Sequence, residues 1–72
     1  MDDFSKAEIE AYSLSLHYGK SWVFTGLDGY PRVTADINRA SRFDEIGYGL
    51  TSIYTDGQKT YTGDWYFPVK GI

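Results

Sequence analysis

His17 is the only histidine in the chain, and the two serines nearest before it are Ser15 and Ser13. A histidine beside a serine could activate the hydroxyl as a nucleophile. If residues 12–18 form a strand, side chains two positions apart stand roughly parallel instead of meeting, and no carboxylate is placed to orient the imidazole. We therefore expect His17 to be a solvated surface residue, and we predict that the protein is not an enzyme.

The remaining acids and glycines match no metal or nucleotide motif. The chain has no cysteine, and neither of its Asp-Gly pairs continues into the alternating acids of a calcium loop. Gly47-Tyr48-Gly49 lacks the third glycine of a dinucleotide-binding loop. Adjacent carboxylates such as Asp44-Glu45 are usually solvated. The sequence therefore predicts neither a metal nor a cofactor.

The acidic residues that could bind a partner are concentrated at the N-terminus. Residues 1–10 hold Asp2, Asp3, Glu8 and Glu10 against Lys6, whereas the rest of the chain carries six acids and six bases, so the whole net charge of −3 lies in this segment. No basic stripe is present, which argues against direct nucleic-acid binding. In an extended chain, Glu8 and Glu10 would project from one face about 6–7 Å apart, near the spacing of successive phosphates. We expect these acids to face a basic protein surface; the alternative is an end that only keeps the protein soluble.

Thirteen of the 72 residues are aromatic, more than so small a domain can bury. Strand alternation assigns most of these rings to the core, among them Trp22, Phe24, Tyr61, Trp65 and Phe67. Three tyrosines remain, Tyr30, Tyr48 and Tyr66, and exposed tyrosines are enriched at binding hot spots. We predict that these three contact the partner; the alternative is that they serve only strand propensity.

Two Asp-Gly pairs, Asp28-Gly29 and Asp56-Gly57, predict two-residue hairpin turns. The first turn would pair Phe24 with Val33 and Trp22 with Ala35, with Val33, Ala35 and Ile37 on one apolar face. The second would join about residues 50–55 to 58–69, with Leu50, Ser52 and Tyr54 on the side of Tyr61. Pro68 would limit that last strand to an edge.

The remaining segments predict one further strand and one helix. Tyr12, Leu14, Leu16 and Tyr18 alternate with polar residues, so residues 12–18 are expected to form a strand, joined through a three-residue loop at 19–21 to a three-stranded meander. A capping box at Ser5-x-x-Glu8 indicates at most one or two helical turns before it. A short helix is expected near residues 38–46, with Asn38 as its N-cap and Gly47 after its end.

The predicted fold is therefore α+β but mostly β, an antiparallel sheet of about five strands built from hairpins with one short helix, in a single domain over residues 1–72. Hydrophobic residues make up 42% of the chain and charged residues 24%, as in ordinary globular proteins. No apolar run has the length of a membrane span, and the acidic start has the wrong sign for a secretory signal. We expect a cytoplasmic protein without membrane contact.

As a whole, the chain resembles small phage-encoded inhibitors such as the anti-CRISPR proteins, which are short, acidic, free of cysteine and without a catalytic set. The residues that carry this resemblance are Asp2, Asp3, Glu8, Glu10 and the surface tyrosines. The resemblance concerns the overall character of the chain and does not rest on an aligned motif. The resemblance implies inhibition by occlusion of a CRISPR effector complex, in the host cytoplasm, with its access to DNA blocked. Thr55-Asp56-Gly57-Gln58-Lys59 with Trp65 resembles a hairpin of an SH3-like barrel. The alternative function is an aromatic platform on a small β-barrel that binds single-stranded nucleic acid or carbohydrate.

Overall fold

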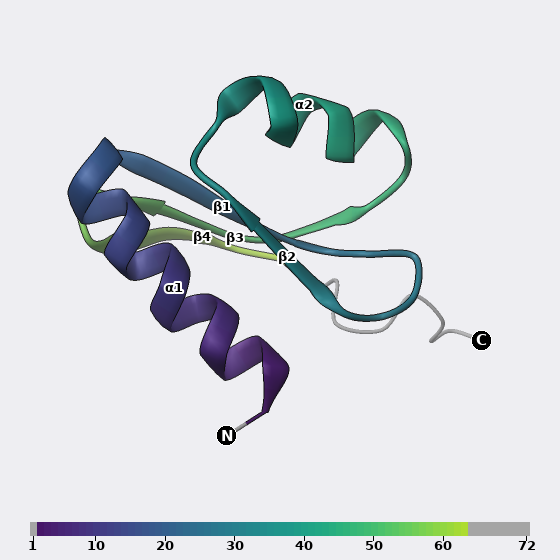
Figure 1. The fold of residues 1–72 in the computed structure, drawn as a ribbon, viewed down its shortest axis with the longest axis horizontal. Coiled ribbons are helices and arrows are strands. Elements are labelled where there is room, and N and C mark those ends of the chain that lie inside the picture. Colours follow the sequence, from purple (N-terminus) through teal and green to yellow (C-terminus); the bar gives the residue numbers. More distant parts are fainter. Residues whose placement is uncertain (1, 64–72) are drawn as a thin grey trace.

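The computed structural model describes residues 2–63, and these form two helices and a four-stranded antiparallel open sheet (Figure 1). The elements in chain order are α1 (Asp3–Tyr18), β1 (Lys20–Thr25), β2 (Pro31–Thr34), α2 (Ile37–Glu45), β3 (Gly49–Thr55) and β4 (Gln58–Thr62). The strand order is β2-β1-β3-β4, so that β2 and β4 form the edges. The α+β class is confirmed, but within residues 2–63 the helices hold 25 residues and the strands 22, so helix and strand are roughly balanced there and not mostly β as expected.

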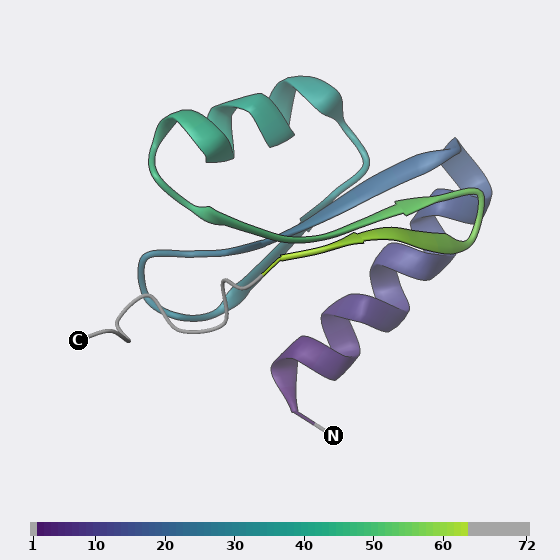
Figure 2. The ribbon, with the colours of Figure 1, turned by 180° about the vertical axis from the view of Figure 1, so that it is seen from behind.

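The two helices lie on opposite faces of the sheet, as both ribbon views show (Figures 1 and 2). On the α1 face, Ala7 and Ala11 pack with Val23 of β1 and Tyr54 of β3 in the buried core. On the α2 face, the ring of Phe24 meets that of Phe43 edge-on, with 5.5 Å between the ring centroids. Val23 and Phe24, which are adjacent in β1, therefore pack on opposite faces of the sheet.

The largest correction concerns residues 12–18, which belong to α1 and not to a strand. Ala7, Ala11 and Ser15 recur every four residues and are buried against the sheet, so small side chains form the packing face. The expected alternation included the large residues Tyr12 and Leu16, which the helix leaves exposed. With this strand lost, the sheet of residues 2–63 has four strands, and the expected meander does not form.

The ends of α1 also differ from the expected capping box. Asp2 is the N-cap, and its Oδ1 accepts a 2.7 Å hydrogen bond from the backbone N–H of Ser5. The helix ends at Gly19, whose φ of 92° suits glycine and whose N–H donates to the carbonyl oxygen of Ser15.

The first Asp-Gly pair lies in a wider loop than the predicted two-residue turn. β1 and β2 pair Val23 with Val33 and Phe24 with Arg32, a register one residue away from the expected one. The Asp28 carboxylate accepts from the N–H of Tyr30 at 3.0 Å and pairs with Arg32, and this holds residues 26–30 as one loop. The expected apolar face over Val33, Ala35 and Ile37 is wrong because β2 ends at Thr34 and Ile37 begins α2.

The second Asp-Gly pair forms the predicted two-residue turn, with positive φ at both Asp56 (51°) and Gly57 (82°). A bulge after the Tyr54–Lys59 pair then shifts the register, so that Tyr61 pairs with Ile53. Tyr61 is exposed and does not share the side of Tyr54, contrary to both expectations. The predicted continuation of this strand to residue 69, with Trp65, Tyr66, Phe67 and Pro68, lies outside the described residues.

The helix expected near residues 38–46 is confirmed as α2. Its N-cap is Asp36 and not Asn38, because the Asp36 Oδ1 accepts from the N–H of Asn38 at 2.9 Å. Gly47 follows the helix with a φ of 97°, as its predicted position requires.

Candidate functional site

Glu8, which was expected to face a partner, is bound inside the molecule. Its carboxylate accepts a 2.7 Å hydrogen bond from the Ser52 hydroxyl and another from the Tyr54 hydroxyl, and it lies 3.1 Å from the Lys59 ammonium. These three residues belong to β3 and β4, so Glu8 fastens α1 to that half of the sheet. Glu8 and Glu10 both lie in the helix α1, so they do not form the row of acids that was expected for an extended chain.

The surroundings of Glu8 shift two pKa values. Burial alone disfavours the charged carboxylate, but hydrogen bonds from Tyr54, Ser52 and Lys59, together with the charge of Lys59, outweigh it and lower the pKa of Glu8 below its ordinary value of 4.5. Burial, and then the hydrogen bond to Glu8, raise the pKa of the Tyr54 hydroxyl well above its ordinary value. The pair is therefore an ionised carboxylate and a neutral phenol at neutral pH.

Asp2 likewise has a structural use. Hydrogen bonds from the backbone N–H and the hydroxyl of Ser5 lower the pKa of the Asp2 carboxyl, which caps α1. The side chain is nevertheless exposed, so its negative charge stays on the surface beside that of Asp3.

Three of the expected binding residues come together on the surface: Asp3, Glu10 and Tyr30. They lie around a hollow of about 320 Å³ between α1 and the start of β2. We call this hollow the acidic groove; its lining residues are Asp3, Lys6, Ala7, Glu10, Tyr30, Pro31 and Val33. Asp3, Lys6 and Glu10 share one side of α1 because they are three and four residues apart, and the loop before β2 brings Tyr30 to them.

The side chains of the acidic groove are available for a ligand. Asp3, Glu10 and Tyr30 are exposed, and within residues 2–63 their side chains make no hydrogen bond or ion pair. Two carboxylates against Lys6 leave the lining with a charge of −1, and the exposed Asp2 adjoins it. The arrangement can receive a cationic side chain, which would pair with a carboxylate and lie over the tyrosine ring.

Tyr48 lies elsewhere and is half-buried. Its ring stacks on Phe43 with 5.2 Å between centroids, and the guanidinium carbon of Arg32 lies 5.6 Å from its centre. Arg32 in turn pairs with Asp28 at 3.0 Å. Tyr48 therefore helps to hold α2 and the β1–β2 loop, while Tyr66 lies outside the described residues.

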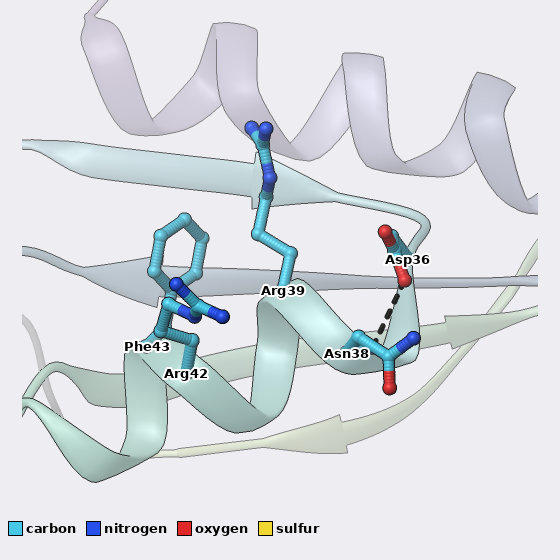
Figure 3. Close-up of a pocket in the computed structure, with 5 residues that line it drawn as sticks. All are labelled: Asp36, Asn38, Arg39, Arg42 and Phe43. Carbon is cyan, nitrogen blue, oxygen red and sulfur yellow. Dashed lines mark hydrogen bonds between the residues drawn. The ribbon is translucent and has the colours of Figure 1, made fainter.

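The sequence interpretation missed a second hollow, of about 400 Å³, on α2 (Figure 3). It is lined by Asp36, Asn38, Arg39, Arg42 and Phe43. No carboxylate of the described residues lies within ion-pair distance of Arg39 or Arg42. The spacing of these two arginines on the expected helix was the signal that could have revealed it, since residues three apart share a face.

The serine and histidine residues of α1 do not form a nucleophile site with one another in the described structure. Ser15 is buried, donates to the carbonyl oxygen of Tyr12 and accepts from the N–H of Gly57. His17 is exposed, and its ring meets that of Tyr18 edge-on.

Residues 2–63 contain no group of three or more histidine, cysteine or acidic side chains that could hold a metal ion. Neither α1 nor α2 is long and apolar enough to cross a membrane.

In comparisons with known proteins, the chain matches no protein-family model, no curated protein and no solved structure.

Proposed function

We propose that the protein is a non-enzymatic inhibitor that docks its acidic groove on a basic surface of a larger protein and occludes it. One observation supports this most: Asp3, Glu10 and Tyr30 surround one hollow although none of their side chains is needed by the fold. Tyrosine offers a large contact area at a low cost in conformational entropy, and unpaired carboxylates supply charge complementarity.

The candidate partner is a CRISPR effector complex, as the resemblance to anti-CRISPR proteins implies. Such complexes hold nucleic acid in positively charged channels. A small protein with carboxylates on its surface would compete there with the DNA phosphates. Because the contact is electrostatic and exposed, the inhibition should weaken as salt rises.

The test measures target-DNA binding by a purified effector complex in a gel-shift titration. We expect the wild-type protein to prevent DNA binding, and the double variant Asp3→Asn/Glu10→Gln to require at least about tenfold more protein, since each lost charged contact costs about 1 kcal/mol or more. The matched control is Asp44→Asn/Glu45→Gln, which changes the net charge equally on exposed positions of α2. An equal effect of both variants would show that net charge, and not the acidic groove, is responsible. An absence of inhibition by the wild type would exclude this partner.

A second candidate function rests on the sheet face opposite α1. The sheet is open, so the expected small β-barrel is wrong. Trp22, Ile53 and Tyr61 are nevertheless aligned across β1, β3 and β4, and the Lys20 ammonium lies 5.7 Å from the centre of the Trp22 ring. The two rings of Trp22 and Tyr61, with the aliphatic side chain of Ile53 between them and a cation beside Trp22, could stack the bases of single-stranded nucleic acid.

A further inference from the structure

The hollow on α2 carries unpaired positive charge on an acidic protein. We call it the arginine hollow; its lining residues are Asp36, Asn38, Arg39, Arg42 and Phe43 (Figure 3). Acids outnumber bases by ten to seven in the chain, yet no carboxylate of residues 2–63 lies within ion-pair distance of Arg39 or Arg42. Arg32 and Lys59, by contrast, are each paired with an acid. Two guanidinium groups of the arginine hollow therefore remain for an anion that enters it.

The two arginines suit a doubly charged anion. Arg39 and Arg42 are three residues apart, so they leave α2 on one side, about 4.5 Å apart along the helix axis. Both side chains are exposed. A planar guanidinium donates parallel hydrogen bonds to two oxygens of one anion, a geometry that fits phosphate. A phosphate monoester carries close to two negative charges at neutral pH, and the two arginines match this charge.

The N-terminal end of the arginine hollow offers partners for hydroxyl groups. Asp36 Oδ1 accepts from the backbone N–H of Asn38 at 2.9 Å, whereas no hydrogen bond or ion pair within residues 2–63 uses Asp36 Oδ2. The side-chain amide of Asn38 can both donate and accept. Figure 3 shows these two residues at the start of α2 and Arg42 farther along the helix. Because the Asp36 carboxylate repels anions and accepts from hydroxyls, a ligand that fills the hollow must present hydroxyl groups there and its phosphate at the arginines.

Phe43 gives the arginine hollow a fixed apolar wall. Its half-buried ring contacts Phe24 edge-on, with 5.5 Å between the centroids, and stacks on Tyr48 at 5.2 Å. These contacts set the position of the ring before a ligand binds. The carbon-bound hydrogens of a sugar, or the ring of a base, can pack against this wall while polar groups at the two ends of the hollow fix the orientation.

We propose that the arginine hollow binds a phosphorylated sugar, free or as part of a nucleotide. The phosphate lies between Arg39 and Arg42, and the sugar hydroxyls bond Asp36 Oδ2 and the Asn38 amide. The volume of the hollow, about 400 Å³, lies within the range of small-molecule sites. α2 and α1 cover opposite faces of the sheet, so this site is separate from the acidic groove and does not rest on the inhibitor function.

The test is a ¹H–¹⁵N NMR titration of the full chain at low salt with ribose 5-phosphate, adenosine monophosphate and inorganic phosphate. We expect ribose 5-phosphate to shift the amide signals of residues 36–43 with a dissociation constant below about 1 mM. Inorganic phosphate lacks the sugar hydroxyls and should bind at least about tenfold more weakly. Adenosine monophosphate distinguishes the sources. Binding at least about tenfold tighter than that of ribose 5-phosphate identifies a nucleotide, and equal or weaker binding identifies a free sugar phosphate.

Two double variants separate the site from the net charge. Arg39→Gln/Arg42→Gln should raise the dissociation constant of ribose 5-phosphate at least about tenfold, and α2 should persist because glutamine and arginine have similar helix propensities. The control Lys6→Gln/Lys20→Gln removes the same charge at two exposed positions outside α2. It should change the dissociation constant by less than about threefold, because distant exposed charges are screened.

Three results would overturn the proposal. The first is a wild-type protein whose signals at residues 36–43 do not move with ribose 5-phosphate up to about 10 mM. The second is equal weakening by the arginine and the lysine variants, which would leave only a general charge effect. The third is equal binding of inorganic phosphate and ribose 5-phosphate, which would show that Asp36 and Asn38 do not bind a sugar. None of these measurements uses the effector complex, so this proposal and the proposed function fail separately.

Discussion

Replacing Glu8 with alanine is expected to lower the free energy of unfolding by about 2–3 kcal/mol at neutral pH. The variant removes the acceptor of the Ser52 and Tyr54 hydroxyls and the counter-charge of Lys59, and it leaves these groups partly buried without their partner. The measurement is urea unfolding followed by circular dichroism. The control is Glu10→Ala, an exposed acid of the same helix, which should change the free energy by no more than about 0.5 kcal/mol.

The effect of Glu8→Ala should also depend on pH. The folded state lowers the pKa of Glu8, so ionised Glu8 stabilises the protein fully above its unfolded-state pKa, near 4.5, and this stabilisation is lost as the pH falls through the folded-state value. The difference between wild type and variant should therefore shrink in acid. A difference of the same size at about pH 3 and about pH 7 would show that the carboxylate charge does not contribute.

Replacing Ala11 with leucine is expected to destabilise the protein by about 3 kcal/mol. Ala11 has no exposed surface, and its carbonyl oxygen accepts a 2.6 Å hydrogen bond from the Ser21 hydroxyl at the start of β1. A larger side chain must push α1 off the sheet and break that bond. Thermal unfolding compares this variant with Ser13→Leu, which adds a leucine on the exposed side of α1 and should shift the midpoint little. An Ala11→Leu variant as stable as the wild type would contradict the close contact between helix and sheet.

The parts of the fold that could be predicted are those with local signals. Asp56-Gly57 forms its turn because both residues adopt positive φ there, and α2 forms where apolar spacing and Gly47 indicate it. Asp28-Gly29 carried the same signal but not the same turn, because the Asp28 carboxylate bonds Tyr30 and Arg32 and stabilises a five-residue loop. A dipeptide alone does not contain these contacts.

α1 could not be predicted from its large apolar residues, because small ones form its packing face. The recurrence of Ala7, Ala11 and Ser15, with Asp2 as a cap, was the available signal. The candidate site could be predicted only in part, because some of its residues depend on contacts that are distant in the sequence. Asp3, Glu10 and Tyr30 stood out by charge and exposure, but Glu8 binds residues 44 and 46 positions away, which only the fold brings near.

The most direct test of the central claim is a ¹H–¹⁵N NMR titration of the full chain with two probes, a peptide of lysine and arginine and an oligothymidylate. If the acidic groove is the docking surface for basic partners, the peptide should shift the amide signals of residues 3–10, Tyr30, Arg32 and Val33 and leave those of Asp44 and Glu45 unchanged. Asp3→Asn/Glu10→Gln should abolish these shifts. Peptide-induced shifts spread over every acidic residue would contradict the account, as would an oligothymidylate that binds across Trp22, Ile53 and Tyr61 while the peptide does not bind.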